Sequence, residues 1–179
     1  MNRRLKLINW VREQHAGQLI KDTDAPYSEH LLEVANRVAN AATLTFEIGL
    51  CHDLLEKTMV TLTALLAQLN DFGYNPDEAE HIGGCVNELT RHFTKAENPL
   101  PKKMRKALED ERLVQISADA QTVKYADLSY NAGWMMAHDR HHAKDYLQSK
   151  LVLIREMTAG QAELRSQVSA QFRDLLLEL

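Results

Sequence analysis

The sequence predicts an all-α fold, because three of its features agree. Apolar residues recur at intervals of three and four along nearly all of the 179 residues, which places them on one face of a helix. No alternating pattern typical of a strand extends beyond a few residues. Seven glycines and four prolines leave room for few turns, so the helices should be long. The length suits one domain with a sizeable core, and we expect it to cover residues 1–179.

Five helices are expected in the first half of the chain, each marked by an apolar face. Their expected ranges are 8–19, 31–41, 46–57, 62–69 and 76–91. Ser28 and Thr61 are the expected N-caps, because a hydroxyl can accept a hydrogen bond from an amide of the first turn. Pro76 suits the first turn of its helix. The glycines at 83 and 84 suggest a close approach of another helix, or a kink.

A break at residues 98–101, which read NPLP, precedes the remaining helices. The next helix is expected to start at Lys102 with a run of basic residues. Further helices are expected over about 119–136, 147–154 and 164–179. The C-terminal helices cover residues 147–179, and the leucines from Leu164 on either close the bundle or form the surface of a homodimer.

Composition and charge argue against several classes of function. Hydrophobic residues make up 45% of the chain and charged residues 26%, which is typical of a globular protein. The net charge is −4, so nucleic-acid binding, which needs a basic surface, is not expected. No apolar run is long enough for a membrane span or a signal peptide. The two cysteines lack a CxxC partner, which favours a reducing cytoplasm.

The strongest chemical signal is a histidine–aspartate pair, His52-Asp53, inside the apolar helix expected over 46–57. Burying an unpaired carboxylate is costly, so Asp53 needs a cation or hydrogen-bond donors. Glu56 follows at helical spacing, which would place all three side chains on one helix face. An imidazole and a carboxylate are ordinary ligands of a divalent metal. For a lone pair of this kind, however, a buried His–Asp hydrogen bond is the simpler interpretation.

Two further positions favour the metal. His30 lies in an amphipathic helix of its own, and Asp127 is another acid among apolar neighbours. Asn131 follows Asp127 at i+4 on the same face. Two histidines and two carboxylates from three helices can converge in a bundle core, which is a recurrent way to build a metal site. His15 lies on an apolar face and is expected to be a core histidine bonded to backbone.

The order of these residues resembles the H…HD…D signature of the HD-domain metal-dependent phosphohydrolases. Neighbouring motifs resemble the (p)ppGpp hydrolase domain of the RelA/SpoT enzymes and the small alarmone hydrolases. They read HAGQ at 15–18, APYSEH at 25–30, HDLLEKT at 52–58, LPK at 100–102 and VKYAD at 123–127. The resemblance spans about residues 5–146 and implies an HD-domain helical bundle with a central metal site.

The resemblance also implies a reaction. One divalent metal, usually manganese in this family, would be held by His30, His52, Asp53 and Asp127. Such a metal lowers the pKa of water and polarises a phosphoryl oxygen. Glu56 matches the first acid of the family's HDxxED motif, which orients or deprotonates the attacking water. In the alarmone hydrolases this water cleaves the 3′ diphosphate of a nucleotide and releases pyrophosphate.

Other residues are implied to bind the substrate. Asn131 matches a residue that helps to place the nucleotide sugar. Candidates for neutralising phosphate charge are Lys21, Arg105 and Lys106.

The chain departs from the family pattern at two places. Lys57 stands where the HDxxED motif has its second acid, so an anion has become a cation at a catalytic position. If Lys57 points into the site, it can bind a phosphate; if it points to solvent, half of the acid pair is gone. Residues 19 and 20 are Leu and Ile, where the family usually has an arginine that stacks on guanine.

These departures leave two alternatives beside (p)ppGpp hydrolysis. One is a phosphatase or nucleotidase acting on another nucleotide, such as a dinucleotide cofactor or a deoxynucleotide. The other is a weakened HD domain that binds a nucleotide as a sensor and signals to a partner. The intact Glu56 argues against the sensor.

Overall fold

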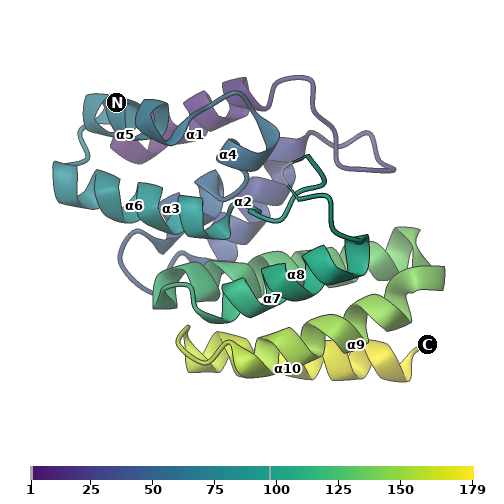
Figure 1. Ribbon diagram of the computed structural model, residues 1–179. Coiled ribbons are helices and arrows are strands. Elements are labelled where there is room, and N and C mark those ends of the chain that lie inside the picture. The colour runs from purple at the N-terminus through teal and green to yellow at the C-terminus, as the bar shows by residue number, and fades with distance from the viewer. Residues whose placement is uncertain (1, 97) are drawn as a thin grey trace. The chain divides into compact units, whose positions relative to one another are not determined.

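The computed structural model describes residues 2–96 and 98–179, and in these ranges the all-α prediction is confirmed (Figure 1). The helices are α1 (Arg3–Gln14), α2 (Tyr27–Val38), α3 (Thr45–Cys51), α4 (Leu54–Lys57), α5 (Leu62–Phe72), α6 (Pro76–Leu89), α7 (Lys102–Val114), α8 (Ala118–His138), α9 (Arg140–Glu156) and α10 (Ala162–Leu177). The described residues add one isolated antiparallel bridge, between Leu19 and Pro26. No helix among them is both long and apolar enough to cross a membrane.

The chain forms two compact units, Met1–Thr90 and Arg91–Leu179. The first contains α1 to α6 and the second contains α7 to α10. The region of family resemblance, about residues 5–146, includes parts of both units. The expectation of one domain over residues 1–179 stays a prediction.

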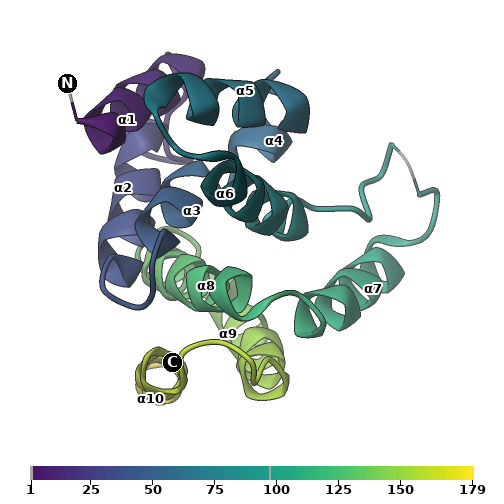
Figure 2. The same ribbon diagram turned by 90° about the vertical axis from the view of Figure 1, so that its left-hand side faces the viewer.

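The core of the first unit is built where α2 and α3 pack against each other (Figure 2). Gly49 of α3 permits this approach, because a Cβ at that position would lie 3.0 Å from the Cα of Ala35 and 3.2 Å from Cγ2 of Val38. Ala35 and Val38 are fully buried on α2. The two backbones therefore come closer together than any larger residue at 49 would allow, and α2 is the helix that carries His30.

A buried carboxylate fastens α1 to this core. Glu47 of α3 is 2% exposed and accepts hydrogen bonds from Arg4 Nε at 3.0 Å and from the Tyr74 hydroxyl at 3.2 Å. Burial, with the negative charge of Glu47, raises the pKa of Tyr74, so its hydroxyl stays protonated and can donate. The guanidinium of Arg4 supplies the positive charge that a buried carboxylate requires.

Several expected helix boundaries are confirmed and others are wrong. Thr61 caps α5 through its hydroxyl, and Pro76 occupies the first turn of α6. Ser28 is not an N-cap, because α2 already begins at Tyr27, after Pro26. The helices expected over 8–19 and 31–41 end earlier, at Gln14 and at Val38. The first ends before Gly17, whose φ of 78° is a left-handed conformation that a helix does not accommodate.

The close approach suggested by the glycines holds for one of them. A Cβ on Gly83 of α6 would lie 2.6 Å from Cδ2 of Leu66 on α5, so these two helices meet there. A Cβ on Gly84 would have no neighbouring atom within 4 Å, and this residue is exposed to solvent. Of these two glycines, therefore, only Gly83 is required by helix packing.

The second unit is held by α8, which packs on both α9 and α10 (Figure 2). The Tyr125 hydroxyl of α8 donates to the carbonyl of Met157 at 2.5 Å. The Gln121 side-chain oxygen accepts from the amides of Ala159 and Gly160, which tie the turn before α10 to α8. Lys150 of α9 donates to Asp110 of α7 at 2.6 Å, so α7 is fastened to α9.

We expect Gly49→Ala to destabilise the protein and Gly84→Ala to stabilise it. Alanine gains about 1 kcal/mol of helix propensity at either site. At 49 the added methyl meets backbone, and overpacking typically costs about 1–3 kcal/mol. At 84 it meets nothing. The melting temperature should fall by several degrees in the first variant and rise by roughly 2–4 °C in the second. Equal shifts in both variants would contradict the close approach of α2 and α3.

Candidate metal centre

The helix expected over 46–57 is interrupted at the residues that matter most. α3 ends at Cys51 and α4 begins at Leu54, so His52 and Asp53 lie in the turn between them. The expectation that His52, Asp53 and Glu56 share one continuous helix face is therefore wrong. Aspartate favours the N-cap of a helix over its interior, and Asp53 is the N-cap residue of α4.

The turn brings three ligand atoms together with His30 of α2. His30 Nε2 lies 3.3 Å from His52 Nε2. Asp53 Oδ2 lies 3.5 Å from His52 Nε2 and 3.9 Å from His30 Nε2. The two imidazoles are 4% exposed and the carboxylate is 15% exposed. Among the residues that the structure describes, this is the group of histidine, cysteine and acid side chains that can hold a metal ion.

The spacing of these atoms fits a shared cation. Two nitrogens about 2.1 Å from one ion, at an angle of about 90–110°, lie roughly 3.0–3.4 Å apart. The observed separation of the two Nε2 atoms, 3.3 Å, falls in that range. His52 Nδ1 lies 2.7 Å from the carbonyl oxygen of Gly49, which can only accept. In the neutral ring Nδ1 therefore carries the proton and Nε2 has the lone pair, as in a metal-binding histidine.

Asp127, the fourth predicted ligand, lies in the second unit on α8 and is 6% exposed. Its Oδ1 accepts from Asn131 Nδ2 at 2.7 Å, which confirms that these two residues share a helix face. Its Oδ2 accepts from Lys124 Nζ at 2.8 Å. Lys124 is a partner of Asp127 that the motifs did not predict, although the i,i+3 spacing could have indicated it. The part of Asp127 in metal binding stays a prediction.

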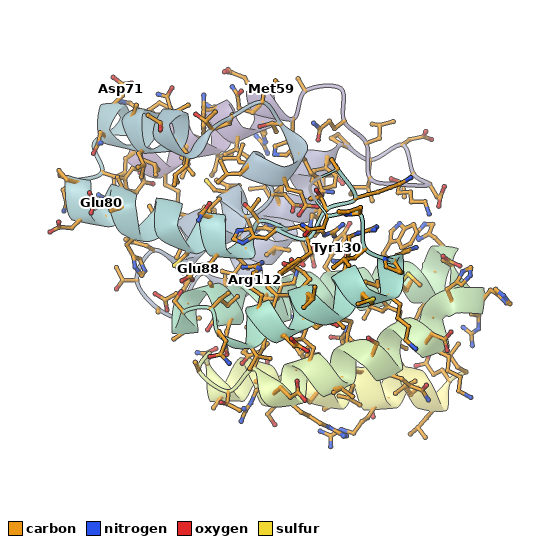
Figure 3. The ribbon with its side chains drawn as sticks, in the orientation of Figure 1. Met59, Asp71, Glu80, Glu88, Arg112 and Tyr130 are labelled. Carbon is orange, nitrogen blue, oxygen red and sulfur yellow. The ribbon has the colours of Figure 1, made fainter. Side chains whose placement is uncertain are left out.

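The two candidate catalytic residues lie on α4, next to the cluster in sequence. Glu56 is half-buried, and its role toward water stays a prediction. Lys57 is exposed, and its ammonium lies 5.4 Å from the centre of the Tyr27 ring. Met59, two residues further on, is 97% exposed, so this end of α4 lies at the surface of its unit (Figure 3).

A group of residues that the sequence analysis did not assign supports the cluster. The Tyr27 hydroxyl donates to Asp53 Oδ2. His15 is buried, as expected, but its Nδ1 lies 2.9 Å from the side-chain oxygen of Gln18 and not from backbone. Burial lowers the pKa of His15, which favours the neutral ring. These residues belong to the motifs at 15–18 and 25–30, so the motifs were the sequence feature that could have indicated their role.

The candidate phosphate-binding residues are divided between the two units. Lys21 of the first unit is exposed, and its Nζ lies 3.6 Å from Oδ2 of Asp22. Arg105 and Lys106 of the second unit lie on α7, where Arg105 Nη1 donates to the carbonyl of Leu100 at 2.5 Å. Lys106 is exposed. That these three cations serve one substrate stays a prediction.

Comparison with known proteins shows what this chain is similar to. No model of a known protein family matches the chain. Over 133 residues the chain is 28% identical to the guanosine-3′,5′-bis(diphosphate) 3′-pyrophosphohydrolase MESH1 of Danio rerio, and the match covers 71% of this chain and 66% of that protein. The fold matches the solved structure of a metazoan SpoT ortholog described as hydrolysing ppGpp, with a TM-score of 0.78 and 18% identity over 97% of this chain and 96% of the other.

The chain is thus similar in sequence to one ppGpp hydrolase and shares its fold with a protein described as another. The resemblance drawn from the motifs is thereby confirmed, and so is the HD-type helical bundle. The cluster of His30, His52 and Asp53 can hold a metal ion.

Removing a ligand should abolish metal binding without unfolding the chain. We expect His52→Ala to weaken Mn²⁺ binding by more than about 100-fold, because changes beyond the direct ligands already cost about 10–100-fold. His81→Ala, which removes an exposed histidine of α6, is the matched control and should bind as the natural protein does. Isothermal titration with Mn²⁺ measures both. Unchanged affinity in His52→Ala would exclude this ligand set.

Proposed function

We propose that this protein is a metal-dependent (p)ppGpp 3′-pyrophosphohydrolase. The observation that supports it most is the cluster of His30, His52 and Asp53, with ligand atoms that all lie within 4.8 Å of one another. The similarity to MESH1 over 71% of the chain supports the substrate class. The nucleotide substrate carries several phosphate charges, and a divalent cation held by one carboxylate and two neutral imidazoles can attract them.

The metal we propose is Mn²⁺, with Asp127 as the fourth ligand. When bound, the ion supplies a Lewis acid for phosphoryl oxygens and lowers the pKa of water. Glu56 accepts the proton of the attacking water. Water adds to the phosphorus of the 3′ diphosphate as the bond to the 3′ oxygen breaks, and that oxygen takes up a proton. The products are pyrophosphate and a nucleotide with a free 3′ hydroxyl.

On the substrate side we propose two kinds of contact. Asn131 has an amide oxygen that can accept from a sugar hydroxyl while its nitrogen donates to Asp127. Lys21, Arg105 and Lys106 neutralise phosphate charge. As part of the proposal we place the protein in the cytoplasm, because the two cysteines of the sequence lack a CxxC partner.

The activity test is direct. Purified protein should contain a divalent metal by elemental analysis and release pyrophosphate from ppGpp in the presence of Mn²⁺. Asp53→Ala should lose about 1000-fold in kcat/KM, since a metal contributes several kcal/mol to phosphoryl transfer. Asp127→Asn should retain the shape of its side chain and lose metal affinity.

A panel of nucleotide substrates distinguishes the proposal from its two alternatives. Turnover of a dinucleotide cofactor or a deoxynucleotide, but not of ppGpp, would replace the proposal with a different nucleotidase. Thermal stabilisation by ppGpp without any product would indicate a nucleotide sensor.

For Lys57 we propose the phosphate-binding alternative, because its ammonium lies 5.4 Å from the centre of the Tyr27 ring, and the hydroxyl of Tyr27 donates to Asp53. An exposed ion pair is worth up to about 1 kcal/mol, so Lys57→Met should raise KM for ppGpp up to about fivefold. Lys57→Arg keeps the charge and should behave as the natural protein. A gain in kcat on Lys57→Asp would instead show that the missing acid limits turnover.

A further inference from the structure

Tyr27 makes a contact that no motif of the sequence assigned to it. It is the first residue of α2, three positions before the ligand His30. Its hydroxyl donates to Asp53 Oδ2. The same oxygen lies 3.5 Å from His52 Nε2 and 3.9 Å from His30 Nε2, so it is the carboxylate oxygen that faces both imidazoles. Tyr27 therefore touches the one ligand atom of Asp53 that the cluster uses.

The Tyr27 ring is held by three neighbours. His15 stacks on it with ring centres 5.4 Å apart and planes at 28°. His30 contacts it with centres 5.3 Å apart. The ammonium of Lys57 lies 5.4 Å from the ring centre, within the range of a cation–π contact. The ring thus has little freedom to carry its hydroxyl away from Asp53.

Gln18 fixes two of these three neighbours with one side chain. Its amide nitrogen donates to the backbone carbonyl of Lys57 at 2.9 Å. Its amide oxygen accepts from His15 Nδ1 at 2.9 Å. The backbone carbonyl of Gln18 accepts from the backbone amide of Tyr27 at 2.9 Å. The loop before α2 is in this way tied both to α4 and to the ring that reaches Asp53.

We propose that Tyr27 is a positioning residue that holds the Asp53 carboxylate in the orientation needed for the metal, with Gln18, His15 and Lys57 holding Tyr27. Asp53 lies in the two-residue turn between α3 and α4, so its side chain is not fixed on a helix face. A carboxylate oxygen has two lone pairs, so Oδ2 can accept from Tyr27 with one and bind a cation with the other. This inference rests on the metal site of the proposed function.

The test compares two tyrosines of the same unit. Tyr27→Phe keeps the ring and its three contacts but removes the donor to Asp53. Tyr74→Phe also removes a hydroxyl that donates to a carboxylate, that of Glu47, which is not part of the cluster. Mn²⁺ dissociation constants are measured by titration, with the electron paramagnetic resonance spectrum of bound Mn²⁺ and the metal-free melting temperature recorded for each variant.

We expect Tyr27→Phe to weaken Mn²⁺ binding about 10–100-fold, as for other partners of metal ligands, with an altered Mn²⁺ spectrum and a nearly unchanged metal-free melting temperature. Tyr74→Phe should do the reverse, with a lowered melting temperature and natural Mn²⁺ affinity. Mn²⁺ affinity within twofold of the natural protein in Tyr27→Phe would overturn the positioning role.

The reference variant Asp53→Ala separates this result from the proposed function. If the natural protein binds Mn²⁺ and Asp53→Ala does not, an unaffected Tyr27→Phe refutes only the role of Tyr27. If the natural protein binds no divalent metal, the metal site itself is refuted, and the proposal for Tyr27 with it.

Discussion

Two imidazoles and a carboxylate, nearly withdrawn from water, meet in the first unit and need polar partners there. His30, His52 and Asp53 contribute ligand atoms within 4.8 Å of one another. Polar groups buried in this way are costly unless each finds a partner. The carbonyl of Gly49 and the hydroxyl of Tyr27 are such partners, and both also direct a ligand atom toward its neighbours. A divalent cation is the partner that would satisfy all three at once.

The packing of α2 on α3 makes this cluster possible. His30 comes from α2, and the other two residues follow the end of α3, so the distance between these helices determines the distance between the ligands. The absence of a side chain at Gly49 lets the backbones approach, and the same residue's carbonyl orients His52. One glycine therefore links the packing of the core to the geometry of the site. Glu47, buried on the same helix, joins α1 to this arrangement through Arg4.

Much of the fold could be predicted from the sequence because amphipathic helices carry their own periodicity. Thr61 and Pro76 lie at helix starts as predicted, since capping depends on neighbouring residues alone. The prediction failed at residues 46–57, where apolar periodicity continues through a break in the helix. A turn at His52-Asp53 leaves the apolar pattern intact, so periodicity could not reveal it.

The sequence by itself determined the helical class, the family resemblance and the identities of the candidate ligands, because these depend on residue type, order and spacing. Only the tertiary structure decided that His30 meets the turn after α3 and that Tyr27 reaches Asp53. These contacts join residues 22 and 26 positions apart. Side chains so far apart in the chain meet only through the packing of whole helices, which local patterns do not encode.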